Sequence, residues 1–429
     1  MAIDNKDKKV LKSSIEREQN EVACSAECEK IKGSKNLNVP HLRFPEFSGE
    51  WKKCIIQDYG EVITGNTPPT NNAEYYNNGS YLWASPADLG TGKKINDTKT
   101  KLSESGFKKT RIIPKGSILV TCIGSTIGKI GMAVETMSSN QQINSIIVNE
   151  KSNNDFVYYA ISRAFPRYLS EVGVQAVPIL SKSNFEKLPN YTTSIEEQDK
   201  TGYFLNLLDE RIATQNKIIE DLKKLKCAII EKVLNGNNAN NLRLGDVGSY
   251  IRGLTYSSDD VVEYNSTLVM RSNNIVNGNL LDYQNNVVSV NKQISQEQQL
   301  QDGDIIICMA NGSSALVGKS SFYDGKCISP ITVGAFCGIY RSKTAITKWL
   351  FQTNRYRRYI WNSLQGGNGA IANLNSEDIL RMSFPLPDKQ TAERCIKLLS
   401  SLESLIESNI SLCSKFFQQK EYLLRQMFI

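Results

Sequence analysis

The sequence lacks most of the residue types on which catalytic and metal sites depend. His41 is the only histidine, and its segment offers no Cys, Asp or second His, so neither a Ser-His-Asp triad nor a zinc site is indicated. Ten cysteines are present, but no two form a CxxC pair. No apolar run approaches a membrane span, and residues 1–10 are rich in Lys and Asp. We therefore expect a cytoplasmic protein with reduced thiols, no metal and no catalytic residues.

Nucleotide-binding motifs are missing as well. The nearest approach to a P-loop is Gly312 followed by Gly318-Lys319-Ser320, but five residues separate the glycines where a P-loop has four. A strand-to-strand turn explains this segment better. No Asn/Asp-Pro-Pro-Tyr site, no paired-carboxylate nuclease motif and no Gly-rich turn of a doubly wound domain occurs. The sequence thus predicts a binding module that carries no cofactor.

What the sequence does contain is a long heptad pattern. Apolar side chains recur at alternating intervals of three and four residues, which is typical of a coiled-coil helix. Two polar residues, Gln215 and Lys226, interrupt the apolar seam. The seam positions are Leu205, Leu208, Ile212, Gln215, Ile219, Leu222, Lys226, Ile229 and Val233.

The pattern returns 194 residues later with the same two interruptions. Asn409 takes the place of Gln215, and Lys420 repeats Lys226. A duplicated helix with duplicated polar positions indicates that the chain consists of two copies of one unit. The second seam is Leu399, Leu402, Ile406, Asn409, Cys413, Phe416, Lys420, Leu423 and Met427.

The segments between these helices predict a mixed α/β domain in each copy. In the first copy, 81–84, 118–122 and 143–148 are expected to be strands and 155–169 a helix. Each long helix starts at a good N-cap, Ser194 in the first copy and Asp388 in the second. The predicted organisation is a flexible extension (1–38), a globular domain (39–193), a helix (194–235), a linker (236–241), a second globular domain (242–387) and a second helix (388–429).

Basic residues gather in one place in each copy. With 51 Lys+Arg against 44 Asp+Glu the chain is only mildly basic, but residues 325–376 contain no Asp or Glu. At the end of that stretch, Arg355, Arg357 and Arg358 alternate with aromatic residues. Guanidinium groups suit phosphates and guanine edges. The alternative is a partly buried helix whose arginines extend along its surface to solvent.

The basic cluster of the first copy lies at a different position in the repeat. It spans residues 93–111, and the alternative interpretation is a solvated loop. If both clusters contact a polyanion, the two copies bind it through different parts of the repeat. The cluster consists of Lys93, Lys94, Lys99, Lys101, Lys108, Lys109 and Arg111.

The order of these segments resembles a known family over residues 40–429. An opening segment, Val39–Phe47 with Trp51, leads to a variable globular domain, and Glu197-Gln198 then opens a helix containing Leu207-Leu208-Asp209. The whole order is then repeated. This layout resembles the specificity subunit of type I restriction-modification enzymes. The second copy departs from the family pattern at its helix start, where it has Lys389-Gln390.

The resemblance implies an α+β fold with two tandem target recognition domains separated by two long antiparallel coiled-coil helices, related by a pseudo-two-fold repeat. Each recognition domain is expected to read one half of a split double-stranded DNA site. The helices are expected to act as a spacer and to dock two methyltransferase subunits, with motor-nuclease (restriction) subunits joining them. Methyl-donor and ATP chemistry would belong to those partners.

Under this interpretation, loop residues read bases and the basic clusters contact phosphates. Amide and guanidinium groups pair bidentately with adenine and guanine, although Asn also serves turns. The expected base readers are Asn66, Arg252, Arg271, Asn273 and Asn274. The expected phosphate contacts are Lys93, Lys94, Lys108, Lys109, Arg111, Arg355, Arg357 and Arg358.

Antiparallel packing of the helices makes a prediction about register. Gln215 should face Asn409, while Lys226 should lie near Leu399 and Lys420 near Leu205. A competing hypothesis is a tandem scaffold that binds only proteins, and a second is a fused methyltransferase. Sequence-selective, salt-dependent DNA binding would separate the first hypothesis from DNA recognition, and a methyl-donor binding assay would test the second.

Overall fold

The computed structural model describes residues 38–172, 179–235, 240–263, 266–364 and 372–429. The chain divides into two compact units, the first comprising 1–213 and 414–429 and the second 214–413. Each long helix therefore contributes to both units. Within the predicted extension and linker, residues 1–37 and 236–239 lie outside the described residues.

The first unit is built on a sheet in the order β2-β9-β6-β7-β4. Its strands pair antiparallel, except that β4 joins β7 in parallel. Strands β6 and β7 are buried along their whole length, which explains their continuous apolar sequences. The bounds are β2 (Gly60–Thr64), β4 (Lys94–Ile95), β6 (Ile118–Thr121), β7 (Ile130–Ala133) and β9 (Ile143–Val148).

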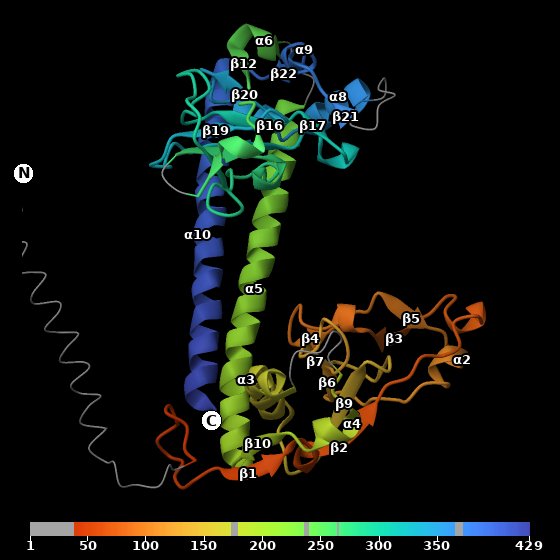
Figure 1. Ribbon diagram of the computed structural model, residues 1–429. Coiled ribbons are helices and arrows are strands. Elements are labelled where there is room, and N and C mark those ends of the chain that lie inside the picture. The colour runs from red at the N-terminus through yellow and green to blue at the C-terminus, as the bar shows by residue number, and fades with distance from the viewer. Residues whose placement is uncertain (1–37, 173–178, 236–239, 264–265, 365–371) are drawn as a thin grey trace, which may run out of the picture. The chain divides into compact units, whose positions relative to one another are not determined.

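A smaller sheet of the first unit lies at the end remote from the long helix α5, Ile195–Leu234 (Figure 1). In it β3 (Tyr81–Ala84) pairs antiparallel with β5 (Thr100–Leu102) and parallel with β8 (Ser138–Ser139). The ribbon of β1 (Lys52–Ile55) and β10 (Pro189–Thr192) leads directly into α5. Short helices α2 (Glu104–Phe107) and α4 (Lys182–Glu186) complete the connections.

The core of the first unit joins the sheet to both long helices. Helix α3 (Asn154–Val172) packs on β6 and β7 and buries Phe156 and Tyr159. The same hydrophobic cluster includes Leu205 of α5 and Met427 of α10 (Lys389–Met427). The globular part and the helices therefore share one core within this unit.

The second unit repeats the main elements of the first. Its main sheet, β12-β20-β16-β18, has the antiparallel order of β2-β9-β6-β7. Its smaller sheet contains the parallel pair β14–β19, which repeats β3–β8. The bounds are β12 (Gly248–Arg252), β14 (Thr267–Met270), β16 (Ile305–Cys308), β18 (Ser320–Phe322), β19 (Ile331–Val333) and β20 (Cys337–Ser342).

The remaining elements of the second unit follow the same plan. The pair β11–β22 takes the place of β1–β10, and α7 and α8 take the place of α3. The segment 312–320, which was compared with a P-loop, is a strand-turn-strand connection between β17 and β18. The bounds are β11 (Asn240–Arg243), α6 (Leu244–Val247), β13 (Val261–Val262), β15 (Val288–Val290), β17 (Ala310–Asn311), α7 (Thr347–Leu350), α8 (Asn354–Leu364), β21 (Ala372–Asn373), α9 (Ser376–Leu380) and β22 (Ser383–Leu386).

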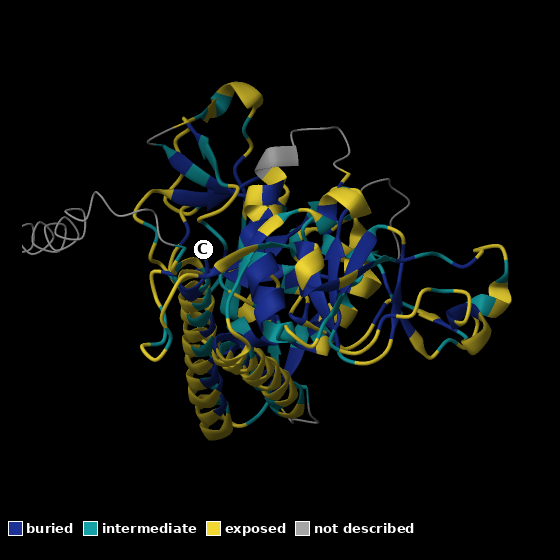
Figure 2. Cartoon of the chain, turned by 90° about the horizontal axis from the view of Figure 1, so that it is seen from below, coloured by how far each residue is buried: buried dark blue, intermediate teal, exposed yellow. Residues whose placement is uncertain are grey.

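The two heptad patterns form long helices, α5 (Ile195–Leu234) and α10 (Lys389–Met427). Both begin one residue after the predicted N-cap, and Asp388 accepts a hydrogen bond from the Thr391 amide at 3.0 Å. Every seam position is buried or half-buried, while most other positions are exposed. Figure 2 shows this as a narrow buried stripe along largely exposed helices.

Candidate nucleic-acid interface

Three strand ends of the second unit meet at one end of its main sheet. There β12 ends at Arg252, β16 ends at Cys308 and β20 begins at Cys337. The 3-10 helix η5 (Ser272–Asn274) follows β14 to the same place, because Asn311 donates a hydrogen bond to Ser272 Oγ at 3.3 Å. We call this the loop end. It brings together the exposed candidate base readers Arg252, Arg271 and Asn273.

The loop end of the first unit lies where β2 and β6 end and β9 begins. Asn66 follows β2, and its side chain forms two hydrogen bonds: Nδ2 donates to Lys109 O at 2.9 Å and Oδ1 accepts from Arg111 N at 2.8 Å. Arg111 also donates to Thr64 O at 2.6 Å. Asn66 thus holds the basic segment against the end of β2 through long-range hydrogen bonds.

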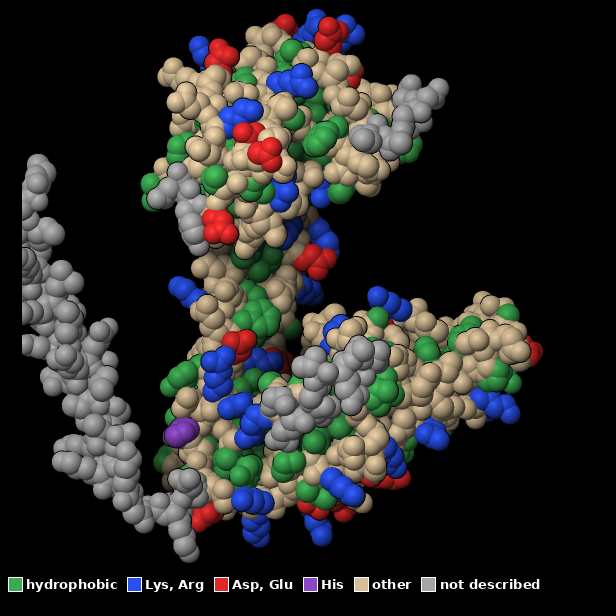
Figure 3. All heavy atoms as spheres, in the orientation of Figure 1, with side chains coloured by type: hydrophobic (Ala, Val, Ile, Leu, Met, Phe, Trp, Pro, Cys, Tyr) green, Lys and Arg blue, Asp and Glu red, His purple; other side chains and the backbone are tan. Residues whose placement is uncertain are grey.

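The basic cluster of the first unit is only partly available to a ligand. Lys94 lies 3.5 Å from Glu210 and Lys108 lies 2.6 Å from Glu104. Lys109 and Arg111 are exposed, and neither forms an ion pair with a carboxylate among the described residues. Figure 3 shows Lys and Arg side chains spread over the visible face of this unit rather than gathered in one patch.

Lys93, which was expected to contact DNA, is buried in the structure. Its side chain is 3% exposed, and its Nζ lies 2.5 Å from Asp155 Oδ1 and 2.9 Å from Asn206 Oδ1. Burial lowers the pKa of Lys93, although the Asp155 carboxylate opposes that shift. The lysine cannot reach a phosphate without leaving this ion pair, in which its ammonium group is buried. Its apparent place in a basic loop concealed a structural role.

Lys93 belongs to a polar cluster that ties the first globular domain to both long helices. Tyr159 of α3 donates to Asp209 of α5 at 2.7 Å, and Lys420 of α10 lies 2.5 Å from the same carboxylate. We call Lys93, Asp155, Tyr159, Asp209 and Lys420 the first joint. Its two lysines and two carboxylates balance in charge.

The second unit has its own polar cluster at the corresponding place. Glu403 of α10 lies 3.6 Å from Lys226 of α5 and forms an ion pair with Lys348 of α7. Lys348 Nζ also lies over the rings of Phe322 and Trp349, 3.4 and 4.9 Å from their centres. We call Lys226, Lys348 and Glu403 the second joint. Two ammonium groups share one carboxylate there.

Asn274, another of the expected base readers, lies inside the loop end. It is completely buried at the end of η5, where Nδ2 donates to Asp282 O and Asn285 O at 3.0 and 2.8 Å. Its Oδ1 accepts from the Arg271 amide at 2.9 Å. Asn274 therefore fixes the loop from which Arg271 and Asn273 project, and turn chemistry accounts for it fully.

The three arginines of the second basic cluster lie on α8. Tyr356 and Ile360 form the buried face of this helix, and Tyr356 donates to Gly318 O at 2.7 Å. Arg355 is half-buried and donates to Asn235 Oδ1 at 3.2 Å, whereas Arg357 and Arg358 are exposed. One face of α8 is therefore core, and the guanidinium groups of Arg357 and Arg358 are exposed.

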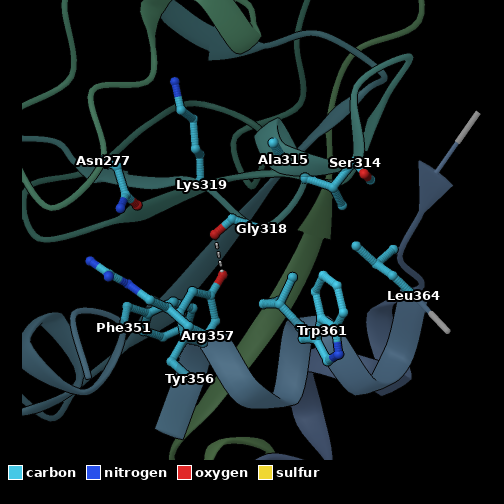
Figure 4. Close-up of a pocket in the computed structure, with 12 residues that line it drawn as sticks. Asn277, Ser314, Ala315, Gly318, Lys319, Phe351, Tyr356, Arg357, Trp361 and Leu364 are labelled. Carbon is cyan, nitrogen blue, oxygen red and sulfur yellow. Dashed lines mark hydrogen bonds between the residues drawn. The ribbon is translucent and has the colours of Figure 1, made fainter. Parts of the chain in front are cut away.

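A pocket of about 230 Å³ opens between α8 and the turn before β18 (Figure 4). Lys319 and Arg357 lie on its polar side, and Trp361, which is 66% exposed, lies on its apolar side. A Cβ on Gly318, whose φ is +78°, would come within 2.6 Å of Ile360. The turn therefore packs directly on α8.

The central polar residues of the two seams are in contact. Gln215 Nε2 donates to Asn409 Oδ1, as the predicted register requires. In the second unit Asn216 contacts Cys413 while Lys226 contacts Glu403, so the numbering rises on one helix as it falls on the other. The packing is antiparallel there. Ion-pair partners for the two seam lysines were not predicted from the sequence.

Comparison with known proteins identifies the family. The family model described as the type I restriction modification DNA specificity domain matches residues 48–224 and again 237–412. The chain belongs to this family. The two matched segments confirm that the chain carries two tandem copies of one domain in a mixed α/β protein with long helices.

Curated relatives of the family share parts of the sequence. The chain is 29% identical over 43% of its length to the HindI specificity subunit of Haemophilus influenzae, and 28% identical over 43% to the EcoR124I/EcoR124II specificity subunit of Escherichia coli. These alignments cover 41% and 46% of those relatives, so the chain matches less than half of each.

Solved structures share the fold. The type I restriction-modification S subunit from M. genitalium aligns with 91% of this chain and 99% of its own length, with a TM-score of 0.57 at 14% identity. A structure concerned with assembly and conformational transition of the type I system aligns with 88% of this chain and 97% of that chain, at a TM-score of 0.51 and 14% identity.

Two further findings concern metal binding and membrane spanning, neither of which was expected from the sequence. In the part of the chain that the structure describes, no group of three or more His, Cys, Asp or Glu side chains is placed to hold a metal ion. Within the same residues, no helix is both long and apolar enough to cross a membrane.

Proposed function

We propose that this chain is the DNA-specificity subunit of a type I restriction-modification complex in the cytoplasm, where its two globular units read the halves of a split double-stranded site. The observation that carries the proposal is the duplicated loop end. Each unit places exposed basic or amide side chains at the same end of the same sheet, on a framework shared with the long helices. The side chains differ between the copies, which suits a non-palindromic site.

The proposed contacts divide into base readers and phosphate contacts. Exposed side chains at the loop end of the second unit are suited to base edges in the major groove, namely Arg252, Arg271 and Asn273. Exposed cations outside the set of proposed base readers are suited to phosphates. They are Lys94, Lys108, Lys109 and Arg111 in the first unit, and Arg357 and Arg358, with Arg355 partly engaged, in the second.

The helices are proposed to form an antiparallel coiled coil, related by the pseudo-two-fold repeat, that spaces the recognition domains and docks two methyltransferase subunits. One side of the helix pair in the second unit is covered by the globular domain, because Ile230 and Glu403, each directly after a seam position, contact it. The residues directly before seam positions lie on the opposite flank.

Apolar side chains occupy this opposite flank. Ile218 and Leu225 on α5, and Leu398, Leu405 and Leu412 on α10, recur every seven residues and are 40–50% exposed. Such a heptad stripe is what a partner helix requires for packing against a helix pair. Leu405→Lys together with Leu412→Lys should abolish copurification of the methyltransferase. The matched control Ser414→Lys, at an exposed position on the opposite side of α10, should not.

The chemistry is proposed to belong to the partners. Methyl transfer would take place on the docked methyltransferase subunits, and cleavage would require restriction subunits that join the same complex. A tandem scaffold that binds only proteins remains the second candidate, because the apolar stripe alone would serve it equally well.

DNA binding decides between these candidates. The complex of this chain with its methyltransferase should bind a duplex containing its split site more tightly than a scrambled duplex, and affinity should fall steeply with salt. Sequencing methylated bases in host DNA would supply the site. Binding that is independent of sequence and salt, or methylation without a split motif, would contradict the DNA-specificity role and support the scaffold.

A further inference from the structure

One loop has the same backbone in both units but carries different chemistry. It connects β8 to β9 in the first unit and β19 to β20 in the second. The Cys122 amide donates to Gln142 O at 2.8 Å in the first unit, and the Met309 amide donates to Phe336 O at 2.9 Å in the second. These hydrogen bonds come from the residue after β6 and after β16, so Gln142 and Phe336 occupy equivalent positions.

The backbone around Phe336 is held firmly at the loop end. The Ala310 amide also donates to Phe336 O at 3.1 Å, so this carbonyl accepts two hydrogen bonds. Two residues earlier, Gly334 donates to Met270 O at 2.8 Å. A Cβ on Gly253 would come within 2.2 Å of Gly334 O, so the loop also packs closely on the end of β12.

The Phe336 side chain nevertheless projects into solvent. It is 67% exposed, although leaving an apolar ring in water does not stabilise the fold. Phe336 borders a hollow of about 330 Å³ that Arg271 and Tyr256 also line. The loop end therefore combines an exposed aromatic ring with a guanidinium group. Hydrogen bonds hold the backbone that carries the ring in place.

The equivalent loop of the first unit presents amides instead. Gln141 is exposed, and Gln142 is half-buried with its Oε1 accepting from Asn140 Nδ2 at 3.1 Å. Asn140 Oδ1 accepts from the Gln142 amide at 3.0 Å, which stabilises this turn. Amide groups can hydrogen-bond to adenine, whereas an aromatic ring cannot.

In the major groove, the apolar group that base edges offer is the C5-methyl of thymine. We infer that Phe336 reads a thymine methyl in the half-site of the second unit, while Gln141 and Gln142 make the corresponding contact of the first unit polar. The inference rests on the proposed DNA-specificity function. It makes this loop the position at which the two recognition domains diverge in base preference.

Uracil in place of thymine tests the inference, because it removes only the methyl group. The complex of the full chain with its methyltransferase would be titrated with duplexes carrying the mapped site, in which each thymine is replaced in turn. For the unaltered chain, one replacement in the second half-site should weaken binding about fourfold, the effect of losing one buried methyl.

Phe336→Ala should remove this discrimination. The variant should bind the unmodified duplex about tenfold more weakly, and the same replacement should then have no further effect. Phe336→Leu should keep part of the preference for thymine. Replacements in the first half-site should affect the unaltered chain and Phe336→Ala equally. Because the ring is exposed, amide hydrogen exchange of the second unit should be unchanged.

Ile328→Ala is the matched control for losing an exposed apolar side chain. Ile328 is fully exposed and follows β18, which runs away from the loop end. This variant should bind as the unaltered chain does. Unchanged thymine preference in Phe336→Ala would overturn the inference, as would a second half-site at which no uracil replacement matters. A bend in the DNA that depends on Phe336, with thymine preference retained, would indicate a wedge between bases and overturn it too.

Failure of the underlying function would be distinguishable. In that case the unaltered chain would bind the mapped site and a scrambled duplex equally at the same salt concentration, and both proposals would fall. Selective binding by the unaltered chain, combined with no role for Phe336, would remove only the inference about the loop.

Discussion

The two joints between globular domain and helix occupy the same place but differ in charge. In the sequence alignment of the copies, Asp155 of the first corresponds to Lys348 of the second. The helix-to-helix pairs are preserved, Asp209 with Lys420 and Glu403 with Lys226. In the first joint the globular domain therefore adds a balanced pair, Lys93 with Asp155, while in the second it adds a lone cation.

The difference shows which part of the duplicated unit is constrained. Pairs within the helix seam must fit a partner helix in either copy, so the charge pattern there is retained. Contacts from the globular domain need only fill the same space with a compensated charge. In the second unit, two aromatic rings help to hold the surplus ammonium group of Lys348.

The largest expected effect comes from removing the single carboxylate of the second joint. Glu403→Gln leaves Lys226 and Lys348 without a counter-charge and should destabilise the second unit by about 3 kcal/mol. Asp209→Asn should cost the first unit less, about 2 kcal/mol, because Lys93 keeps Asp155. Amide hydrogen exchange, analysed separately for each unit, would measure both values.

Lys348→Met provides the control for this comparison. Combined with Glu403→Gln it removes one of the two unpaired cations, so the double variant should recover part of the lost stability. Equal losses in Glu403→Gln and Asp209→Asn, without recovery in the double variant, would contradict the proposed difference between the joints.

The second expected effect concerns a hydrogen-bonded carboxylate in the first turn of the long helix, which only the first copy possesses. Glu197 accepts hydrogen bonds from Arg43 at 2.7 Å and from Trp51 at 3.2 Å, whereas Thr391 stands at its position in the second copy. Burial alone would raise the pKa of Glu197, but hydrogen bonds from Arg43, Thr193 and Trp51 lower it below the usual value. Glu197→Gln should destabilise the first unit by about 2 kcal/mol.

The lowered pKa also fixes the direction of the pH dependence. Because the folded-state pKa lies below the unfolded one, the stabilisation is complete above about pH 4.5 and is lost as pH falls through the folded-state value. The unaltered first unit should lose more stability in that range than the Glu197→Gln variant. Denaturation monitored from pH 6 to 3 would measure this, and parallel curves would contradict it.

How much of this the sequence could predict depends on the residue. The seam, the duplication and the strands 81–84 and 143–148 follow local periodicity, and the structure confirms them. The roles of Lys93 and Asn274 do not follow from local periodicity. An ammonium or amide group looks the same in sequence whether it meets solvent or a distant carboxylate or carbonyl. Phe336 was missed because an isolated Phe in an apolar stretch predicts a core position.

The third expected effect tests whether the available arginines of α8 contact phosphates. Arg357→Ala with Arg358→Ala should weaken DNA binding about tenfold and reduce the slope of log affinity against log salt by about two. Arg381→Ala is the matched control, since Arg381 is exposed but pairs with Glu377. Unchanged affinity and slope would remove α8 from the interface and leave only its role in the core.

The smallest expected effect comes from the polar contact that both seams share. Asn409→Leu leaves Gln215, which is 8% exposed, without its partner and should cost about 1 kcal/mol. Gln215→Leu should cost less, because Asn409 is half-buried and still donates to Leu405 O at 2.7 Å. Replacing both with Leu should recover the stability but weaken the preference for one register. Chemical denaturation gives the three values. A double variant less stable than either single one would show that the amide pair contributes net stability instead of only fixing the register.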